Sequence, residues 1–289
     1  MIKFGPSGSD DEFLQSPEYG GTVDMPRYVR AQGLQCFEYS FCKGVRMGTE
    51  TAVHIGDAFR EADVEISVHA PYFINFANPD PEKIQNSFGY VTASLDALRL
   101  LGGTRCVFHP GSPLKRSREE AMADMERNVA RLAAILHEGG YDDMRVCPET
   151  MGKVNQMGTV EEIAALCRLD PIFTPCVDFG HVNARGQGCL RTADDFKRVV
   201  DTFAKVLDWD RVSNMHVHFS KIEYTAMGEK CHLTMDDTVY GPEFEPLAEV
   251  LVEYGMTPYI VSESAGTQGR DACRMRDIYL ATKARMGVE

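Results

Sequence analysis

Short hydrophobic runs rich in β-branched residues recur along the whole chain and are separated by longer, more polar stretches. Each run is shorter than a typical helix and has the composition of a buried β-strand. The sequence therefore predicts eight strands. They lie at Ile2–Gly8, Leu34–Ser40, Glu65–Pro71, Arg105–Gly111, Arg145–Thr150, Phe173–Phe179, Val212–Ser220 and Pro258–Ser264.

The segments between these runs show helical periodicity. Residues that fall on one face of a helix are Ile84, Phe88, Val91, Leu95 and Leu98 in one segment and Ala121, Met125, Val129, Leu132 and Ile135 in the next. Two segments open with a capping box, Ser117-x-x-Glu120 and Thr159-x-x-Glu162. The pattern predicts a helix after most strands.

Alternating strands and helices are typical of a parallel sheet, and eight such units close into a barrel. An open doubly wound sheet usually carries a glycine-rich phosphate loop after an early strand, and the sequence has no such motif. No linker or low-complexity stretch divides the chain. We therefore predict the α/β fold class, with one (β/α)₈ TIM-barrel domain over residues 1–289 and a site at the C-terminal ends of its strands.

Composition narrows the class of protein. The formal net charge of the 289 residues is −13, which disfavours nucleic-acid binding driven by bulk charge but leaves room for a local basic rim. The nine cysteines form no Cys-x-x-Cys pair, and four of them, Cys36, Cys106, Cys147 and Cys176, lie in strand-like runs, as buried reduced thiols would. The sequence shows neither a membrane span nor the parts of a signal peptide, so we expect a cytoplasmic monomer.

Six consecutive predicted strands deliver a residue that can bind a metal ion. These residues are His69, His109, Glu149, Asp178, His216 and Glu263. Because barrel strands end at one mouth, the side chains are expected to converge there. Clustered carboxylates and imidazoles need neutralising cations, and mixed nitrogen and oxygen ligands favour Zn²⁺, with Mn²⁺ as an alternative. Strand alternation also points His218 to the same side as His216, nearer the mouth.

A long segment after the seventh strand, Lys221–Gly241, carries several acidic residues and a histidine. Long irregular connections in compact domains are usually functional. The segment is either a solvated acidic loop, or Glu229 and His232 fold back and hold a further metal ion.

The ordered motifs resemble endonuclease IV, a family of metal-dependent apurinic/apyrimidinic endonucleases among the xylose-isomerase-like barrels. The matching stretches are His69-Ala-Pro-Tyr72-Phe-Ile-Asn75, His109-Pro-Gly-Ser112, Glu149-Thr150, Cys176-Val-Asp178-Phe-Gly-His181, His216 and Glu263. The resemblance covers essentially the whole chain in strand order. It implies a DNA-repair hydrolase that cuts DNA 5′ to abasic sites by a metal-activated hydroxide.

The resemblance also implies a ligand set for two or three zinc ions per chain. The first would be held by His69, His109 and Glu149, the second by Glu149, Asp178, His216 and Glu263, and the third by His181 with Glu229 and His232. Glu149 would be the catalytic residue that orients the nucleophile. Two departures stand out: the family has an Asp-x-His pair where this chain has Glu229-Lys-Cys-His232, and usually asparagine where this chain has His218.

Contacts to DNA that contains an abasic site are implied as well. Tyr72 occupies a position that lies in a DNA-penetrating loop in the family, and Asn75, Arg185 and Lys221 are expected to bind substrate. Other basic residues near the mouth that would contact phosphates are Lys43, Arg46, Lys115, Arg116, Arg118, Lys153 and Arg270.

Two other functions fit the same fold. A sugar isomerase or epimerase of the superfamily would need one divalent ion, for which Glu149, Asp178, His216 and Glu263 suffice. It would leave His69, His109 and His181 without a role as ligands, so a count of bound metal ions separates the two. The other alternative is a barrel that has lost catalysis and binds a ligand or partner.

Overall fold

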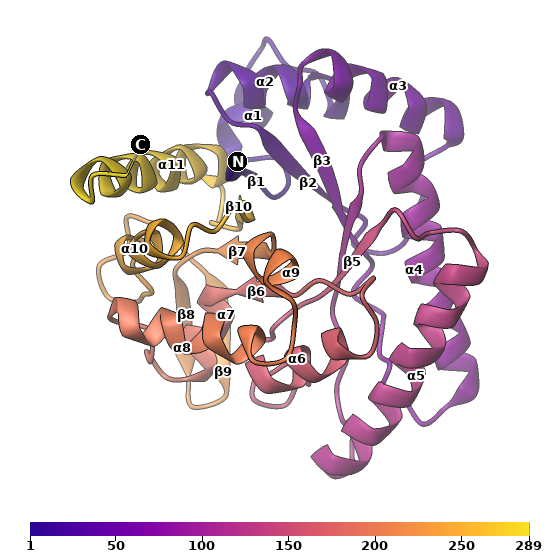
Figure 1. The fold of residues 1–289 in the computed structure, drawn as a ribbon. Coiled ribbons are helices and arrows are strands. Elements are labelled where there is room, and N and C mark those ends of the chain that lie inside the picture. Colours follow the sequence, from indigo (N-terminus) through magenta and orange to yellow (C-terminus); the bar gives the residue numbers. More distant parts are fainter. Residues whose placement is uncertain (289) are drawn as a thin grey trace.

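The computed structural model describes residues 1–288, and its centre is the predicted barrel of parallel strands (Figure 1). The barrel strands are β1 (Lys3–Pro6), β2 (Cys36–Ser40), β3 (Glu65–His69), β4 (Arg105–Phe108), β5 (Arg145–Pro148), β6 (Cys176–Asp178), β7 (His216–Phe219) and β10 (Tyr259–Ser262). All eight lie within the predicted runs. The (β/α)₈ fold is confirmed.

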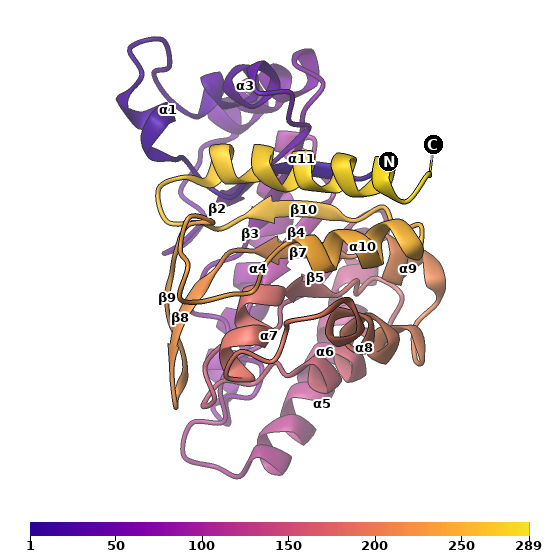
Figure 2. The same ribbon diagram turned by 90° about the vertical axis from the view of Figure 1, so that its left-hand side faces the viewer.

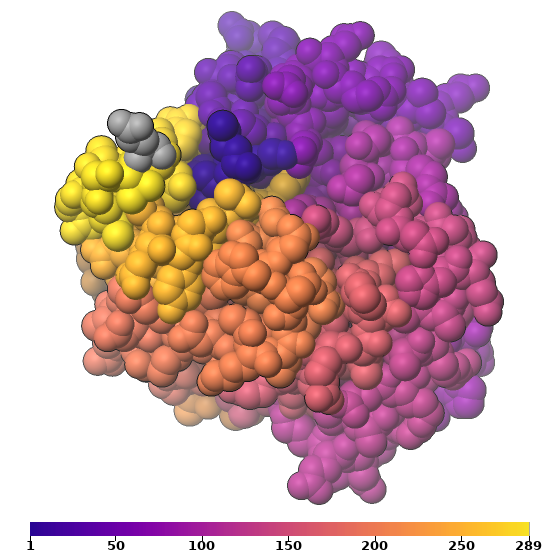
Figure 3. Space-filling view, in the orientation of Figure 1, coloured from indigo at the N-terminus to yellow at the C-terminus, as the bar shows by residue number. Residues whose placement is uncertain are grey.

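Helices surround the strands, as the periodicity predicts. They are α1 (Asp11–Gln15), α2 (Met25–Ala31), α3 (Thr49–Glu61), α4 (Pro81–Leu101), α5 (Arg118–Glu138), α6 (Val160–Arg168), α7 (Phe179–Arg185), α8 (Ala193–Ala204), α9 (Trp209–Ser213), α10 (Glu245–Glu253) and α11 (Gln268–Arg285), with a 3₁₀ turn at Thr22–Asp24. Both predicted capping boxes are present, at the starts of α5 and α6. The N-terminal strand packs beside α11, so the start of the chain lies next to the C-terminal helix on one face (Figure 3).

Three segments differ from the sequence prediction. Val212 and Ser213 belong to α9, so the seventh strand begins only at His216, and Phe179 starts α7 instead of ending the sixth strand. The segment after β7 is not an irregular loop: it forms an antiparallel hairpin of β8 (Ile222–Thr225) and β9 (Gly228–His232). This hairpin extends from the end of the barrel opposite the chain termini (Figure 2).

The barrel consists of two four-stranded halves that meet at two seams. At one seam Glu149, one of the predicted metal ligands, bridges to Cys176. At the other, Ser7 bridges to Glu38, and Gly5 lies so close to β2 that an added Cβ would be 1.6 Å from the carbonyl oxygen of Cys36. Only glycine allows the strands to approach this closely.

Replacing Gly5 by alanine is therefore expected to destabilise the protein by about 1–3 kcal/mol, because β1 must move away from β2. Gly89, on the exposed side of α4 with no atom within 4 Å of an added Cβ, is the matched control. Its alanine variant should instead gain about 0.5–1 kcal/mol from helix propensity. Urea unfolding of the two variants measures both changes, and equal effects would contradict the role of Gly5.

The core and the helices show two further features. Cys36, Cys106, Cys147 and Cys176 are buried free thiols, as predicted. Within residues 1–288, none of the helices is both long enough and apolar enough to cross a membrane.

Candidate metal centre

The predicted ligands converge at the carboxyl ends of the strands, with Glu149 at their centre. This residue follows β5 directly, and its side chain is 1% exposed. Its Oε2 lies 3.1 Å from Nε2 of His69 at the end of β3 and 3.1 Å from Nε2 of His109 just after β4. The three residues form a group whose ligand atoms lie within 4.8 Å of one another.

Two of the histidines are held in the tautomer that a metal ligand needs. Nδ1 of His69 lies 2.9 Å from the carbonyl oxygen of Ala70, and Nδ1 of His181 lies 3.0 Å from that of Thr150. A carbonyl only accepts hydrogen bonds, so Nδ1 carries the proton in both rings. In the neutral form of each ring the lone pair is then on Nε2, which faces Glu149 in His69 and Glu229 in His181.

A second group contains His218 in place of His216. Its members are Glu149, Asp178, His218 and Glu263. Nδ1 of His218 lies 3.1 Å from Oε1 of Glu149 and 3.6 Å from Oε1 of Glu263. The β6–β7 register places His218 beside Asp178, whereas His216 lies beside Cys176, one layer deeper in the barrel. The assignment of His216 to this group is thus corrected to His218.

A third group, His181, Glu229 and His232, depends on the hairpin. His181 is in the first turn of α7, and its Nε2 lies 3.4 Å from Oε2 of Glu229 on β9. The hairpin is fixed to the loop after β5, where the backbone N–H of Glu229 donates to the carbonyl of Gly152. A Cβ on Gly152 would lie 2.7 Å from Cβ of Glu229, so glycine permits this approach. Of the two interpretations of this segment, the structure supports the one in which it folds back.

The carboxylates and imidazoles shift one another's pKa values. Burial alone would raise the pKa of Glu149, but the charges of His218 and His109 hold it well below its usual range. Burial lowers the pKa of His69, yet its hydrogen bond to Glu149 and the negative charges of Glu149 and Glu38 together outweigh burial and raise the pKa to about 9. For Asp178, burial dominates and raises the pKa to about 6. Without metal, protons on the imidazoles neutralise the cluster.

These residues fit divalent metal ions. Each of the three groups combines imidazole nitrogen with carboxylate oxygen, the donor set that suits Zn²⁺ or Mn²⁺. The buried Oδ2 of Asp178 has no hydrogen-bond partner, and a cation in the second group would satisfy this oxygen by coordinating it. The groups are therefore able to hold metal ions.

The groups share a cavity of about 300 Å³ that opens at the mouth. His69, His109, Glu149, His181, Glu229, His232 and Glu263 line it, together with Tyr72 and Lys153. Tyr72 is 51% exposed, at the entrance, where it was predicted to meet substrate. Beside this cavity is a second one of about 450 Å³, lined by Lys43 and Arg46 and sharing Ser40 and Cys42 with the first.

Three residues that were expected to bind substrate have structural partners instead. Asn75 joins the loops after β3 and β4 by hydrogen bonds with Ser112. Arg185 donates to backbone carbonyls of the loop after β5, among them those of Met151 and Lys153. Lys221 is 3% exposed, and its Nζ lies 2.6 Å from Oε1 of Glu243. Each of the three side chains therefore has a structural role, and their contact with substrate stays a prediction.

Several of the basic residues predicted near the mouth of the barrel are paired with carboxylates. Arg116, Arg118 and Arg270 form ion pairs with Asp124, Glu162 and Asp236. In the part of the chain that the structure describes, Lys43, Arg46 and Lys115 have no such partner. Of these three basic residues, Lys43 and Arg46 line the cavity beside the candidate metal centre.

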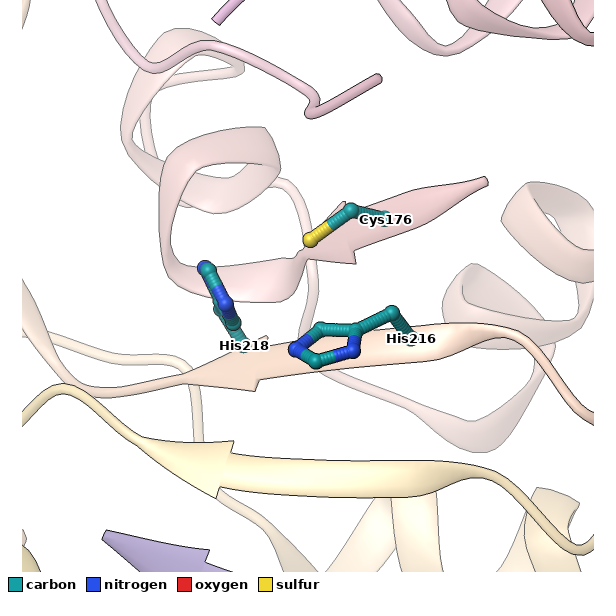
Figure 4. Close-up of side chains that lie close together, drawn as sticks. All are labelled: Cys176, His216 and His218. Atoms are coloured by element: carbon teal, nitrogen blue, oxygen red, sulfur yellow. The ribbon is translucent and has the colours of Figure 1, made fainter. Parts of the chain in front are cut away.

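Glu38 is the residue of this region that sequence reasoning missed. It points into the barrel from β2 and is fully buried against His216 and His218. Figure 4 shows that these two histidines and Cys176 of β6 point toward one another. A glutamate inside the apolar run Leu34–Ser40 was the available signal, because buried charges are rarely unpaired.

Two sequence relatives and two solved structures illustrate what the chain is similar to. It is 30% identical over 268 residues to an uncharacterized protein of Methanocaldococcus jannaschii, covering 91% of this chain and 92% of that protein. It is 31% identical over 172 residues to a probable endonuclease 4 of Acholeplasma laidlawii, covering 57% of this chain and 56% of the relative.

Among solved structures, a D-tagatose 3-epimerase-like protein has a TM-score of 0.71 at 18% identity, with 99% of this chain and 98% of the other covered. Endonuclease IV from Thermus thermophilus has a TM-score of 0.66 at 19% identity, with 98% and 99% covered. At these identities the likeness concerns the fold, and it does not separate the two activities. The sequence pattern of one family matches residues 26–277, and this chain belongs to that family, the xylose isomerase-like TIM barrels.

Proposed function

We propose that the protein is a metal-dependent phosphodiesterase of the endonuclease IV type, which hydrolyses DNA 5′ to abasic sites. The observation that supports this is the third ligand group, His181, Glu229 and His232, at the same cavity as the other two. An isomerase that uses one ion has no need of it. Neighbouring divalent ions, when bound, stabilise charge on the attacking and leaving oxygens of a phosphodiester and acidify a water molecule.

Glu149 is the catalytic residue of this proposal. Its two carboxylate oxygens face different groups, Oε2 toward His69 and His109 and Oε1 toward His218. The carboxylate is therefore fixed from several sides and holds one orientation. A fixed acceptor at the floor of the cavity can orient the attacking water toward a phosphoryl group above it.

The mouth offers contacts to a nucleic-acid strand. Lys43 and Arg46 line the neighbouring cavity, where they would pair with phosphates on one side of the cleaved bond. Tyr72 and Phe73 are about half exposed, and their ring centroids lie 4.4 Å apart. Exposed aromatic rings beside a basic cavity are suited to stacking on bases or filling the gap at a missing base.

A sugar isomerase or epimerase is the second candidate. Its support is specific: Glu149, Asp178, His218 and Glu263 form a complete four-residue group that suffices for one ion. Solved structures similar in fold include enzymes described as epimerases. Under this alternative the substrate is a sugar.

The test pairs metal analysis with two substrates. The purified protein, loaded with Zn²⁺ or Mn²⁺, is expected to incise a duplex that contains one abasic site, and a chelator should abolish incision. The same duplex without the abasic site is the control. A fully loaded protein that leaves the abasic duplex intact but interconverts keto-sugars would overturn the proposal in favour of the epimerase.

The third group makes a separate prediction about metal stoichiometry. Glu229→Ala is expected to remove one of the bound metal ions and leave those held through Glu149. Glu223→Ala is the matched control, because Glu223 lies on the same hairpin, pairs with Lys230 and belongs to none of the groups. Elemental analysis of both variants measures the difference. A wild-type protein that binds a single ion would contradict the proposed phosphodiesterase.

A further inference from the structure

A buried carboxylate lies directly beneath the second ligand group. Glu38 on β2 is 0% exposed, and its two oxygens face two histidines of β7. Oε1 lies 3.0 Å from Nε2 of His218, and Oε2 lies 3.0 Å from Nε2 of His216. The hydroxyl of Ser67 donates to Oε2 over 3.2 Å. A carboxylate so far from solvent requires partners on both oxygens.

His218 connects this carboxylate to the metal-binding residues. Its Nδ1 faces Oε1 of Glu149 and Oε1 of Glu263, at 3.1 and 3.6 Å, while its Nε2 faces Glu38. The ring is fully buried, so both nitrogens must be satisfied inside the protein. The two sides of the imidazole thus have different partners: the ligand group above and Glu38 below.

We propose that Glu38 is a positioning residue for the metal centre: it accepts the Nε2 proton of His218 and thereby presents the Nδ1 lone pair to the ion in the second group. The proposal rests on metal binding by that group, which is part of the proposed function. It does not depend on whether the substrate is DNA or a sugar.

The chemistry of imidazole gives the reason. A neutral ring that binds a metal through Nδ1 carries its proton on Nε2, and an acceptor there fixes the tautomer and the orientation of the ring. Among the described residues, Nε2 of His216 and Nε2 of His218 are buried without a well-formed hydrogen bond, and each lies 3.0 Å from an oxygen of Glu38. Glu38 is therefore placed to accept from either ring. An N–H left without an acceptor at this depth would cost about 1–3 kcal/mol. His216 contacts the other oxygen of Glu38, Oε2, and this second contact fixes the orientation of the carboxylate.

Cys176, His216 and His218 also form a group that is compact enough for a cation (Figure 4). An ion there that used Nε2 of His218 would compete with the proposed role. His218 would then have to serve two ions through its two nitrogens, which requires loss of both ring protons. Glu38 can accept the Nε2 proton of His218 without that loss, so we assign this region to positioning.

The test measures metal affinity instead of activity. Zn²⁺ binding to full-length protein is followed by competition with a chromogenic chelator for wild type, Glu38→Gln and Glu38→Ala. Glu38→Ala is expected to weaken one of the bound ions by about 10–100-fold, the usual effect of removing such a partner. Glu38→Gln keeps one acceptor oxygen and a similar volume, so its loss should be smaller. Circular dichroism and thermal unfolding of the metal-free forms identify a variant that fails to fold.

Cys176→Ser is the matched control, because it leaves the contact between Glu38 and His218 intact. Its Zn²⁺ stoichiometry and affinity are expected to equal those of wild type. Loss of one equivalent in Cys176→Ser would overturn the proposal and indicate an ion in the deeper group. Unchanged affinity in folded Glu38→Gln and Glu38→Ala would overturn it as well. Weakened binding in a protein that does not incise DNA would refute only the proposed function.

Discussion

Replacing Glu149 by glutamine is expected to lower incision of an abasic duplex by at least about 1,000-fold. One preorganised polar group at a reacting centre is typically worth about 10²–10³ in rate, and Glu149 in addition contributes to two metal-binding groups at once. The amide removes the negative charge that balances His69 and His109, so their ion should bind more weakly too. Single-turnover incision and elemental analysis measure the two effects.

Glu161→Gln provides the control for this experiment. Glu161 is an exposed residue in the first turn of α6, and it belongs to none of the ligand groups. Its variant should incise the abasic duplex at the wild-type rate. A Glu149→Gln protein that retained full incision with a full complement of metal would refute the catalytic role of Glu149.

The strands and helices were predictable because their signals are local. Alternation of apolar runs with helical stripes requires no knowledge of tertiary contacts. The predicted ends of the strands were wrong where an apolar residue belongs to the following or preceding helix. Phe179 continues the apolar run of β6, yet it packs in the core against Phe196 of α8, while Asp178 caps the start of α7. Hydrophobicity alone does not separate these two uses of a phenylalanine.

The choice between His216 and His218 shows where sequence reasoning about the site ends. Side-chain alternation correctly places both in the barrel interior. Which of them reaches the ligand group depends on the register between β6 and β7, which pairs Asp178 with His218. Register is set by long-range packing, so a motif read along one strand does not determine it.

The contacts of long polar side chains were harder to predict from the sequence than the choice between the two histidines. Lys221 follows the end of β7 and Arg185 is the last residue of α7, both on the side of the barrel where substrate-binding residues are common, but each contacts a structural partner instead. The residue type predicts which bonds a side chain can form, whereas its direction depends on the loop that it meets. For Glu38 the direction of the side chain was predictable from its place in the strand, but its partners were not. They are His216 and His218, which are far from Glu38 in the sequence.

Metal removal is expected to destabilise the protein by about 4 kcal/mol for each ion that is present at 1,000 times its dissociation constant. The size of this effect should depend on pH. In the metal-free protein burial lowers the pKa of His69, but the hydrogen bond to Glu149 and the charges of Glu149 and Glu38 together outweigh burial and raise the pKa from 6.5 to about 9. The stability from this pair is complete below pH 6.5 and disappears as pH rises through about 9, a loss of about 3 kcal/mol.

In the metal-loaded protein this loss is absent, because a metal ion needs the neutral imidazole and displaces its Nε2 proton. Rising pH therefore strengthens metal binding over the same range in which the metal-free protein loses stability. We expect the difference in Tm between the loaded and the chelated protein to widen from pH 6.5 to pH 9. Thermal unfolding at several pH values, with and without chelator, measures it. A constant difference would mean that His69 does not exchange a proton for a metal ion at Nε2, and the first ligand group would lose its assignment.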